Sequence, residues 1–133
     1  MAQFKNLEMA TALSMHHDIK IEKSLFGLRA KAVYQPTGSP LEVYSVDYAP
    51  EASKQLERLL SYAPEMLLEA AATLPGVKPS QIGNTHMEAC VSADRKFAAV
   101  QLFRYSDLMT SPITDMKCYE GDAVAVLFEH LGL

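Results

Sequence analysis

Apolar residues recur every three or four positions between residues 50 and 74, which is the strongest pattern in the chain. The stripe consists of Ala52, Leu56, Leu59, Leu60, Ala63, Leu67, Ala70, Ala71 and Leu74. This spacing places the apolar side chains on one face of a long central helix. Pro50 suits the first helical position, where its missing N–H is not needed. Pro64 lies inside the stripe and removes a helical hydrogen bond, so we expect either a kink or two helices, 50–62 and 64–74, that share one buried face.

Alternating apolar and polar residues before this stripe predict strands at 18–26, 28–35 and 41–48. The last two flank the segment Pro36-Thr37-Gly38-Ser39-Pro40, whose residues are typical of turns. The pattern therefore predicts a hairpin with a loop of about five residues.

A second hairpin is predicted after the stripe, from strands at 86–92 and 97–105 joined by a polar turn. Residues 97–103 are apolar on both faces, so helices or a second subunit must cover both sides of this strand. Residues 106–112 are expected to form a loop, and residues 113–119 a last short strand.

Two short helices are predicted at the ends of the chain, over residues 3–16 and 122–131. The elements together indicate an α+β fold in which an antiparallel sheet, built from two hairpins, packs against the long central helix. The length of 133 residues fits a single domain over residues 1–133.

Composition and charge narrow the classes of function. Hydrophobic residues make up 49% of the chain and charged residues 21%, which is typical of a folded globular domain. The net charge of −4 argues against nucleic-acid binding, which needs surplus Lys and Arg. No apolar run reaches the ~18–20 residues that span a membrane. The mixed N-terminal segment does not resemble a signal peptide, so we expect a cytoplasmic protein.

Sequence motifs for common cofactors and metals are missing. The chain has no glycine-rich phosphate loop, no HExxH and no CxxC, and no cofactor is predicted. His16 and His17 are adjacent, which points their side chains about 100° apart on a helix and to opposite faces on a strand. No metal site is therefore expected there.

Aromatic residues on the predicted hairpins are the candidates for binding a ligand or partner. These candidates are Tyr34, Tyr44, Tyr48, Phe103 and Tyr105. A row of tyrosines on one sheet face can bind an extended peptide or a small apolar ligand. The alternative is that these rings pack in the core with their hydroxyl groups near water.

His86, Cys90 and Cys118 are the candidates for catalysis. On a strand, His86 and Cys90 share a face but lie about 13 Å apart, too far to hold one ion together. Cys118, on another predicted strand, can approach either of them. The simpler interpretation is that both cysteines are reduced and buried.

Two classes of function follow from these features. The first is a non-enzymatic binding module, a small acidic homodimer that holds a protein segment or a small apolar ligand, with residues 97–103 in the dimer interface. The second is a small enzyme with a pocket between sheet and helix that uses His86, Cys90, Cys118 and nearby tyrosines. The element order α–β–β–β–α–β–β–α, the length and the acidic pI are similar to those of type III secretion chaperones, which implies a role in holding a partner protein.

Overall fold

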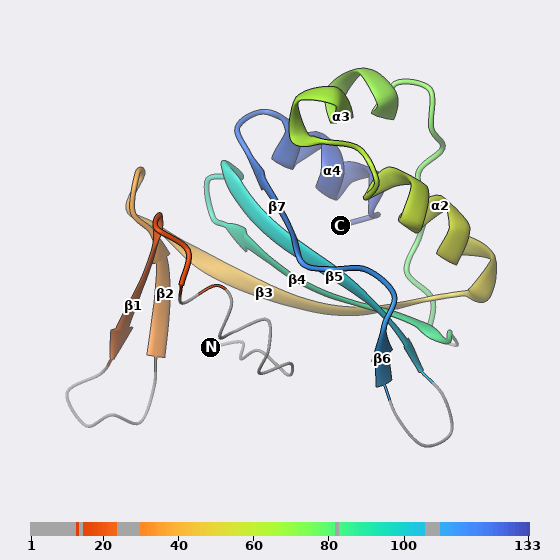
Figure 1. Ribbon diagram of the computed structural model, residues 1–133, viewed down its shortest axis with the longest axis horizontal. Helices are drawn as coiled ribbons and strands as arrows, with labels where there is room; N and C mark the ends of the chain where they lie inside the picture. The colour runs from red at the N-terminus through yellow and green to blue at the C-terminus, as the bar shows by residue number, and fades with distance from the viewer. Residues whose placement is uncertain (1–12, 14, 24–29, 82, 106–109) are drawn as a thin grey trace.

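The computed structural model describes residues 13, 15–23, 30–81, 83–105 and 110–133 (Figure 1). Within them, seven strands form one mostly antiparallel sheet, and helices pack on it in an α+β arrangement. The strands are β1 Ile19–Lys23, β2 Ala30–Tyr34, β3 Ser39–Tyr48, β4 Thr85–Ser92, β5 Phe97–Tyr105, β6 Thr110–Pro112 and β7 Lys117–Glu120. The helices are the 3-10 turn η1 Pro50–Ala52, α2 Ser53–Leu59, α3 Pro64–Ala71 and α4 Ala123–His130.

The strands follow the order β1-β2-β3-β4-β5-β6, and β7 pairs with β5 beside β6. The ten-residue strand β3 connects the two parts of the sheet, because its start pairs with β2 and residues 41–48 pair with β4. Figure 1 shows β1 and β2 at one end of β3, away from the helices. The β4–β5 connection lies where the sequence predicted it. The first turn covers residues 35–38, and Ser39 and Pro40 belong to β3 rather than to the predicted loop of residues 36–40. Two separate hairpins under a helix are not confirmed.

The predicted long central helix is not confirmed, because the chain forms α2 and α3 with a break between them. Ala63 has extended backbone angles, and Pro64 begins α3 at its first turn. A residue before proline avoids the helical region, and proline lacks the N–H that would continue the helix. The second predicted alternative, two helices sharing one buried face, matches the observed arrangement.

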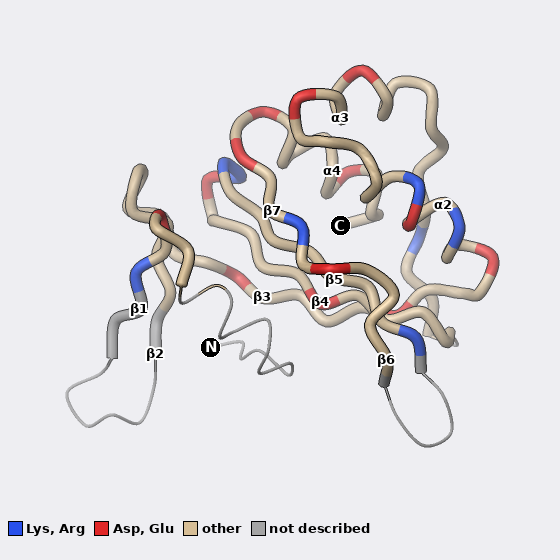
Figure 2. The backbone as a smooth tube through the Cα atoms, viewed as in Figure 1, with Lys and Arg blue, Asp and Glu red and all other residues tan. Residues whose placement is uncertain are grey.

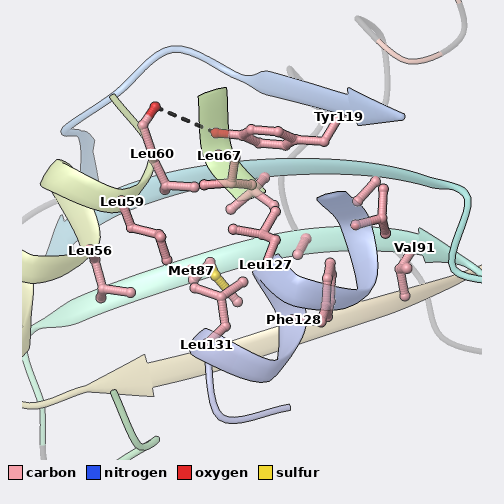
Figure 3. Close-up of a cluster of buried hydrophobic side chains, with 14 of the residues drawn as sticks. Leu56, Leu59, Leu60, Leu67, Met87, Val91, Tyr119, Leu127, Phe128 and Leu131 are labelled. Atoms are coloured by element: carbon pink, nitrogen blue, oxygen red, sulfur yellow. Dashed lines mark hydrogen bonds between the residues drawn. The ribbon is translucent and has the colours of Figure 1, made fainter. Parts of the chain in front are cut away.

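The main core lies between one face of the sheet and helices α2, α3 and α4 (Figure 3). Its fully buried side chains include Leu56, Leu60, Leu67, Met87, Leu102 and Leu127. The Tyr48 hydroxyl donates a hydrogen bond of 2.6 Å to the Leu131 carbonyl, which ties the end of α4 to the sheet. No helix in the described ranges is long and apolar enough to cross a membrane.

A second core covers the other face of β5 at its beginning. Leu13, Ile19, Tyr34, Cys90, Phe97 and Ala99 form this cluster. Both faces of residues 97–103 are thus buried within one chain, since Ala98, Val100 and Leu102 face the main core. The prediction that both faces need cover is confirmed, and this cover does not require a second subunit.

The remaining predicted helices and strands differ from the observed ones mainly in the residues at which they begin and end. The predicted helix over residues 3–16 lies almost entirely outside the described residues. The C-terminal helix is confirmed as α4. The strand predicted at 113–119 is shorter, and β6 occupies the end of the predicted loop. Ile113 and Thr114 interrupt the pairing because the Ile113 N–H donates to the Leu102 carbonyl and the Thr114 hydroxyl oxygen accepts from the Leu102 N–H.

Candidate functional site

Four polar side chains from β3 and β4 gather on the sheet face opposite the helices. Asp47 pairs with His86 and Ser45 pairs with Glu88 in the antiparallel register. Residues two apart on a strand share a face, so the register brings all four together. Figure 2 shows acidic positions on β3 and β4 among mostly uncharged neighbours. We call Ser45, Asp47, His86 and Glu88 the His86 site.

The His86 ring contacts a different partner at each nitrogen. Its Nδ1 lies 2.7 Å from Asp47 Oδ1, and its Nε2 lies 3.2 Å from Ser45 Oγ. A carboxylate only accepts hydrogen bonds, so Asp47 fixes the proton of a neutral ring on Nδ1. Nε2 then carries the lone pair and accepts the hydrogen bond that Ser45 donates.

Glu88 is a second acidic neighbour of the same ring. Its Oε1 lies 3.5 Å from His86 Nε2, on the side opposite the contact with Asp47. Glu88 is only 2% exposed, and its Oε2 has no hydrogen-bond partner. A buried carboxylate oxygen without a partner is costly, which is unusual outside sites that bind or react.

Solvent reaches the site from the β3 side. Ser45 is exposed and 40% of the Asp47 side chain is exposed, whereas His86 is 5% exposed. A molecule that approaches the site therefore meets the Ser45 hydroxyl before the imidazole. The two carboxylates face opposite nitrogens of the ring, so a single metal ion cannot bind His86 together with both of them.

The structure does not bring His86 together with the cysteines. His86 and Cys90 are four residues apart on β4, as predicted. Burial raises the pKa of Cys90 to about 12 and also raises the pKa of the partly buried Cys118. Both thiols therefore stay protonated near neutral pH, where a thiol is a poor nucleophile and metal ligand.

The aromatic candidates fall on different faces and mostly inside the protein. Tyr34 stacks on Phe97 in the second core, with ring centroids 5.1 Å apart. Tyr44 packs against Phe128 at 5.7 Å, and Tyr48 is fully buried in the main core. The structure therefore does not assemble a single tyrosine-lined surface from these residues.

Phe103 is the aromatic candidate next to the His86 site. It is buried, it pairs with His86 across β4 and β5, and the two ring centroids lie 6.4 Å apart. The Tyr105 backbone pairs with Thr110, and its side chain lies outside the described residues.

Sequence reasoning missed Ser45, Asp47 and Glu88. A signal was present, because polar residues occur two apart in both segments that were predicted to be strands. What the sequence did not show was the register that sets Asp47 opposite His86.

A separate open pocket of about 450 Å³ lies between α2 and the segment that connects β6 to β7. It is lined by Glu57, Leu60, Ser61, Pro112, Ile113, Thr114, Asp115 and Lys117. The enzyme hypothesis expected a pocket between sheet and helix, but this one carries none of the histidine, cysteine or tyrosine side chains of that hypothesis.

Comparisons of the chain with known protein families, with curated proteins and with solved structures found no match. Within the described residues, α2 and α3 take the place of the single predicted central helix and four strands follow them, so the observed element order differs from the predicted order on which the resemblance to type III secretion chaperones was based. Function is therefore inferred from the side chains of the His86 site and the pocket.

Proposed function

We propose that this protein is a small enzyme that acts by nucleophilic catalysis, with Ser45 as the nucleophile, His86 as the general base and Asp47 as the residue that orients the base. The observation that supports this proposal is the hydrogen-bond chain from Ser45 Oγ through the His86 ring to Asp47 Oδ1. A nucleophile, a base and an orienting acid within hydrogen-bond reach are the elements that acyl transfer by serine requires.

The proposed reaction is the hydrolysis of an ester through an acyl-enzyme. The Ser45 oxygen attacks the ester carbonyl while its proton passes to His86 Nε2. The tetrahedral intermediate then collapses, and the alcohol leaves with the proton that His86 returns. Water then attacks the carbonyl carbon of the acyl-Ser45 ester while one of its protons passes to His86 Nε2. The acid is released, and His86 returns the proton to the Ser45 oxygen, which restores the hydroxyl. Asp47 stabilises the imidazolium that forms in each step.

Glu88 is a further neighbour of the proposed base. Its Oε1 lies 3.5 Å from His86 Nε2, the nitrogen that must accept the Ser45 proton. A negative charge at this distance stabilises the imidazolium that forms when the proton is transferred. Glu88→Gln keeps the size of the side chain and removes the charge, so we expect this variant to react more slowly with ester than the unmodified protein.

A fluorophosphonate probe tests the nucleophile directly, because it forms a covalent bond to an activated serine and releases fluoride. We expect mass spectrometry to find the label on Ser45. Loss of the base in His86→Gln should slow labelling by about 10²–10⁴-fold, the usual contribution of a general base. Ser45→Ala should abolish labelling, and Ser111→Ala on the exposed strand β6 serves as the matched control.

Two results would overturn the proposal. The first is an unmodified protein that does not react with the probe across the pH range in which it stays folded. The second is labelling that persists in Ser45→Ala, since the reactive group would then be elsewhere. Circular dichroism of each variant ensures that a loss of labelling is not a loss of fold.

The second candidate function is a cytoplasmic binding module for a protein segment or a small apolar ligand. It is favoured by the open pocket beside Leu60 and Ile113 and by two large apolar side chains on the surface of α3, Met66 at 52% and Leu68 at 46% exposed. Two unpaired cysteines are consistent with a reducing compartment. The net charge of −4 argues against a nucleic-acid partner. This candidate includes neither a nucleic-acid partner nor a membrane partner.

A homodimer is part of this second candidate. The exposed side chains of α3 are the apolar surface that a second copy would cover, now that both faces of β5 are buried within the chain. Light scattering at tens of micromolar measures the mass. A value near the 14.7 kDa of a single chain would exclude the homodimer.

A further inference from the structure

We propose that His16, His17 and Asp18 form a binding site for a divalent transition-metal ion of the Zn²⁺ class. One nitrogen from each histidine and one carboxylate oxygen of Asp18 lie within 4.8 Å of one another. Two imidazoles and a carboxylate are a ligand set that zinc sites use, with the remaining position open to water.

The local backbone explains why this site was not expected from the sequence. Residues 15–18 form a turn, which precedes β1 in Figure 1, rather than a helix or a strand. The His16 N–H donates to the Leu13 carbonyl at 3.0 Å, and the Ile19 N–H donates to the His16 carbonyl at 3.1 Å. The turn brings the adjacent rings of His16 and His17 into a stack with centroids 4.7 Å apart.

The turn is held against the body of the protein on both sides. Leu13 and Ile19 are buried in the second core. The His16 ring meets Phe97 edge-on at 5.2 Å, and the Asp18 carbonyl accepts a hydrogen bond of 2.8 Å from the Gln35 N–H. Two of the three ligands therefore start from a fixed backbone, which lowers the entropy cost of closing them around an ion.

The third ligand has room to move. The His17 side chain is 83% exposed, and its Nε2 already lies 3.1 Å from Asp18 Oδ2. Zinc binds nitrogen and oxygen at about 2.0–2.2 Å, so the ligand atoms must come closer together than the present 4.8 Å limit. Rotation of the exposed His17 ring provides this movement without a change in the core.

The donor atoms also limit which metals fit. Imidazole nitrogen suits Zn²⁺, Ni²⁺ and Cu²⁺, whereas Mg²⁺ and Ca²⁺ prefer oxygen ligands. The site is separate from the His86 site, because His16 packs on the first residue of β5 and His86 pairs with Phe103, six residues further along that strand. Metal binding and ester hydrolysis can therefore be tested independently.

Isothermal titration of the full chain with Zn²⁺ is the direct test. We expect one Zn²⁺ per chain, with no competition from Mg²⁺. His17→Ala and Asp18→Asn should each weaken Zn²⁺ binding by at least about 10–100-fold, because loss of an outer-shell partner alone has an effect of that size. His16→Phe removes the other histidine ligand but keeps an aromatic ring against Phe97. Co²⁺ in place of zinc gives a visible spectrum that reports nitrogen ligands.

Two controls separate this site from other sources of binding. Asp115→Asn removes an exposed carboxylate elsewhere and should leave the affinity unchanged. Cys118→Ser removes the more accessible thiol and should also have no effect. The proposal is wrong if the unmodified protein fails to bind Zn²⁺, if the three site variants bind as tightly as it does, or if binding is lost in Cys118→Ser.

Discussion

Leu67 and Leu68 are neighbours on α3, yet Leu67 is fully buried in the main core and Leu68 is 46% exposed. Substitution of each by alanine removes the same atoms and changes helix propensity by the same amount. The difference between Leu67→Ala and Leu68→Ala therefore isolates the free energy of burial.

The size of this difference follows from the packing of Leu67. Leucine to alanine removes three carbon groups, and burial of each contributes about 0.8 kcal/mol, which gives roughly 2.4 kcal/mol. The vacated space adds a cavity term because α3, α4 and the sheet relax only in part, so we expect Leu67→Ala to lower the free energy of unfolding by about 2–5 kcal/mol. The exposed Leu68 has solvent on one side and should cost less than about 1 kcal/mol.

Urea denaturation followed by circular dichroism measures both values under the same conditions. The slope of unfolding free energy against urea should stay unchanged, so that a shift in midpoint reports stability alone. Equal losses in the two variants, or a loss below about 1 kcal/mol in Leu67→Ala, would contradict the placement of this face of α3 in the core.

Four further outcomes are expected from the same assay. Tyr48→Phe leaves the Leu131 carbonyl without its 2.6 Å hydrogen bond and should cost about 1–3 kcal/mol. Burial raises the pKa values of Cys90 and Tyr119 to about 12, so the fold favours their neutral forms. Their contribution to stability is complete below about pH 9 and is lost as the pH rises toward 12, so unfolding midpoints should fall over that range. Cys90→Ser places a hydroxyl at a fully buried position and should cost about 1–3 kcal/mol, whereas Cys118→Ser, at a half-buried position, should cost less.

Most of the elements could be predicted because local patterns dominate them. The nearly unbroken apolar run in residues 97–103 predicted a strand that is covered on both faces, and both faces of β5 are buried there. The apolar stripe predicted which leucines of α2 and α3 enter the core. The break at Pro64 remained one of two alternatives, since a proline within a helix either bends it or ends it, and the packing of the two segments decides which.

The candidate sites were harder to predict because each depends on contacts between distant or irregular segments. Asp47 and His86 are 39 residues apart, and only the register of β3 on β4 places them in contact. His16 and His17 are adjacent, but a turn rather than a regular element sets the direction of their side chains. Local propensity carries no information about either arrangement.

The sequence by itself determined the α+β class, the positions of most strands and helices, and the apolar faces that they bury, because hydrophobic periodicity acts over a few neighbouring residues. The tertiary structure alone decided that β3 is shared between two parts of the sheet and that the second core covers β5 within one chain. It also decided which polar residues meet around His86. These features arise from pairing between strands that are far apart in the sequence, where a shift of one residue would turn Ser45 and Asp47 to the opposite face of the sheet.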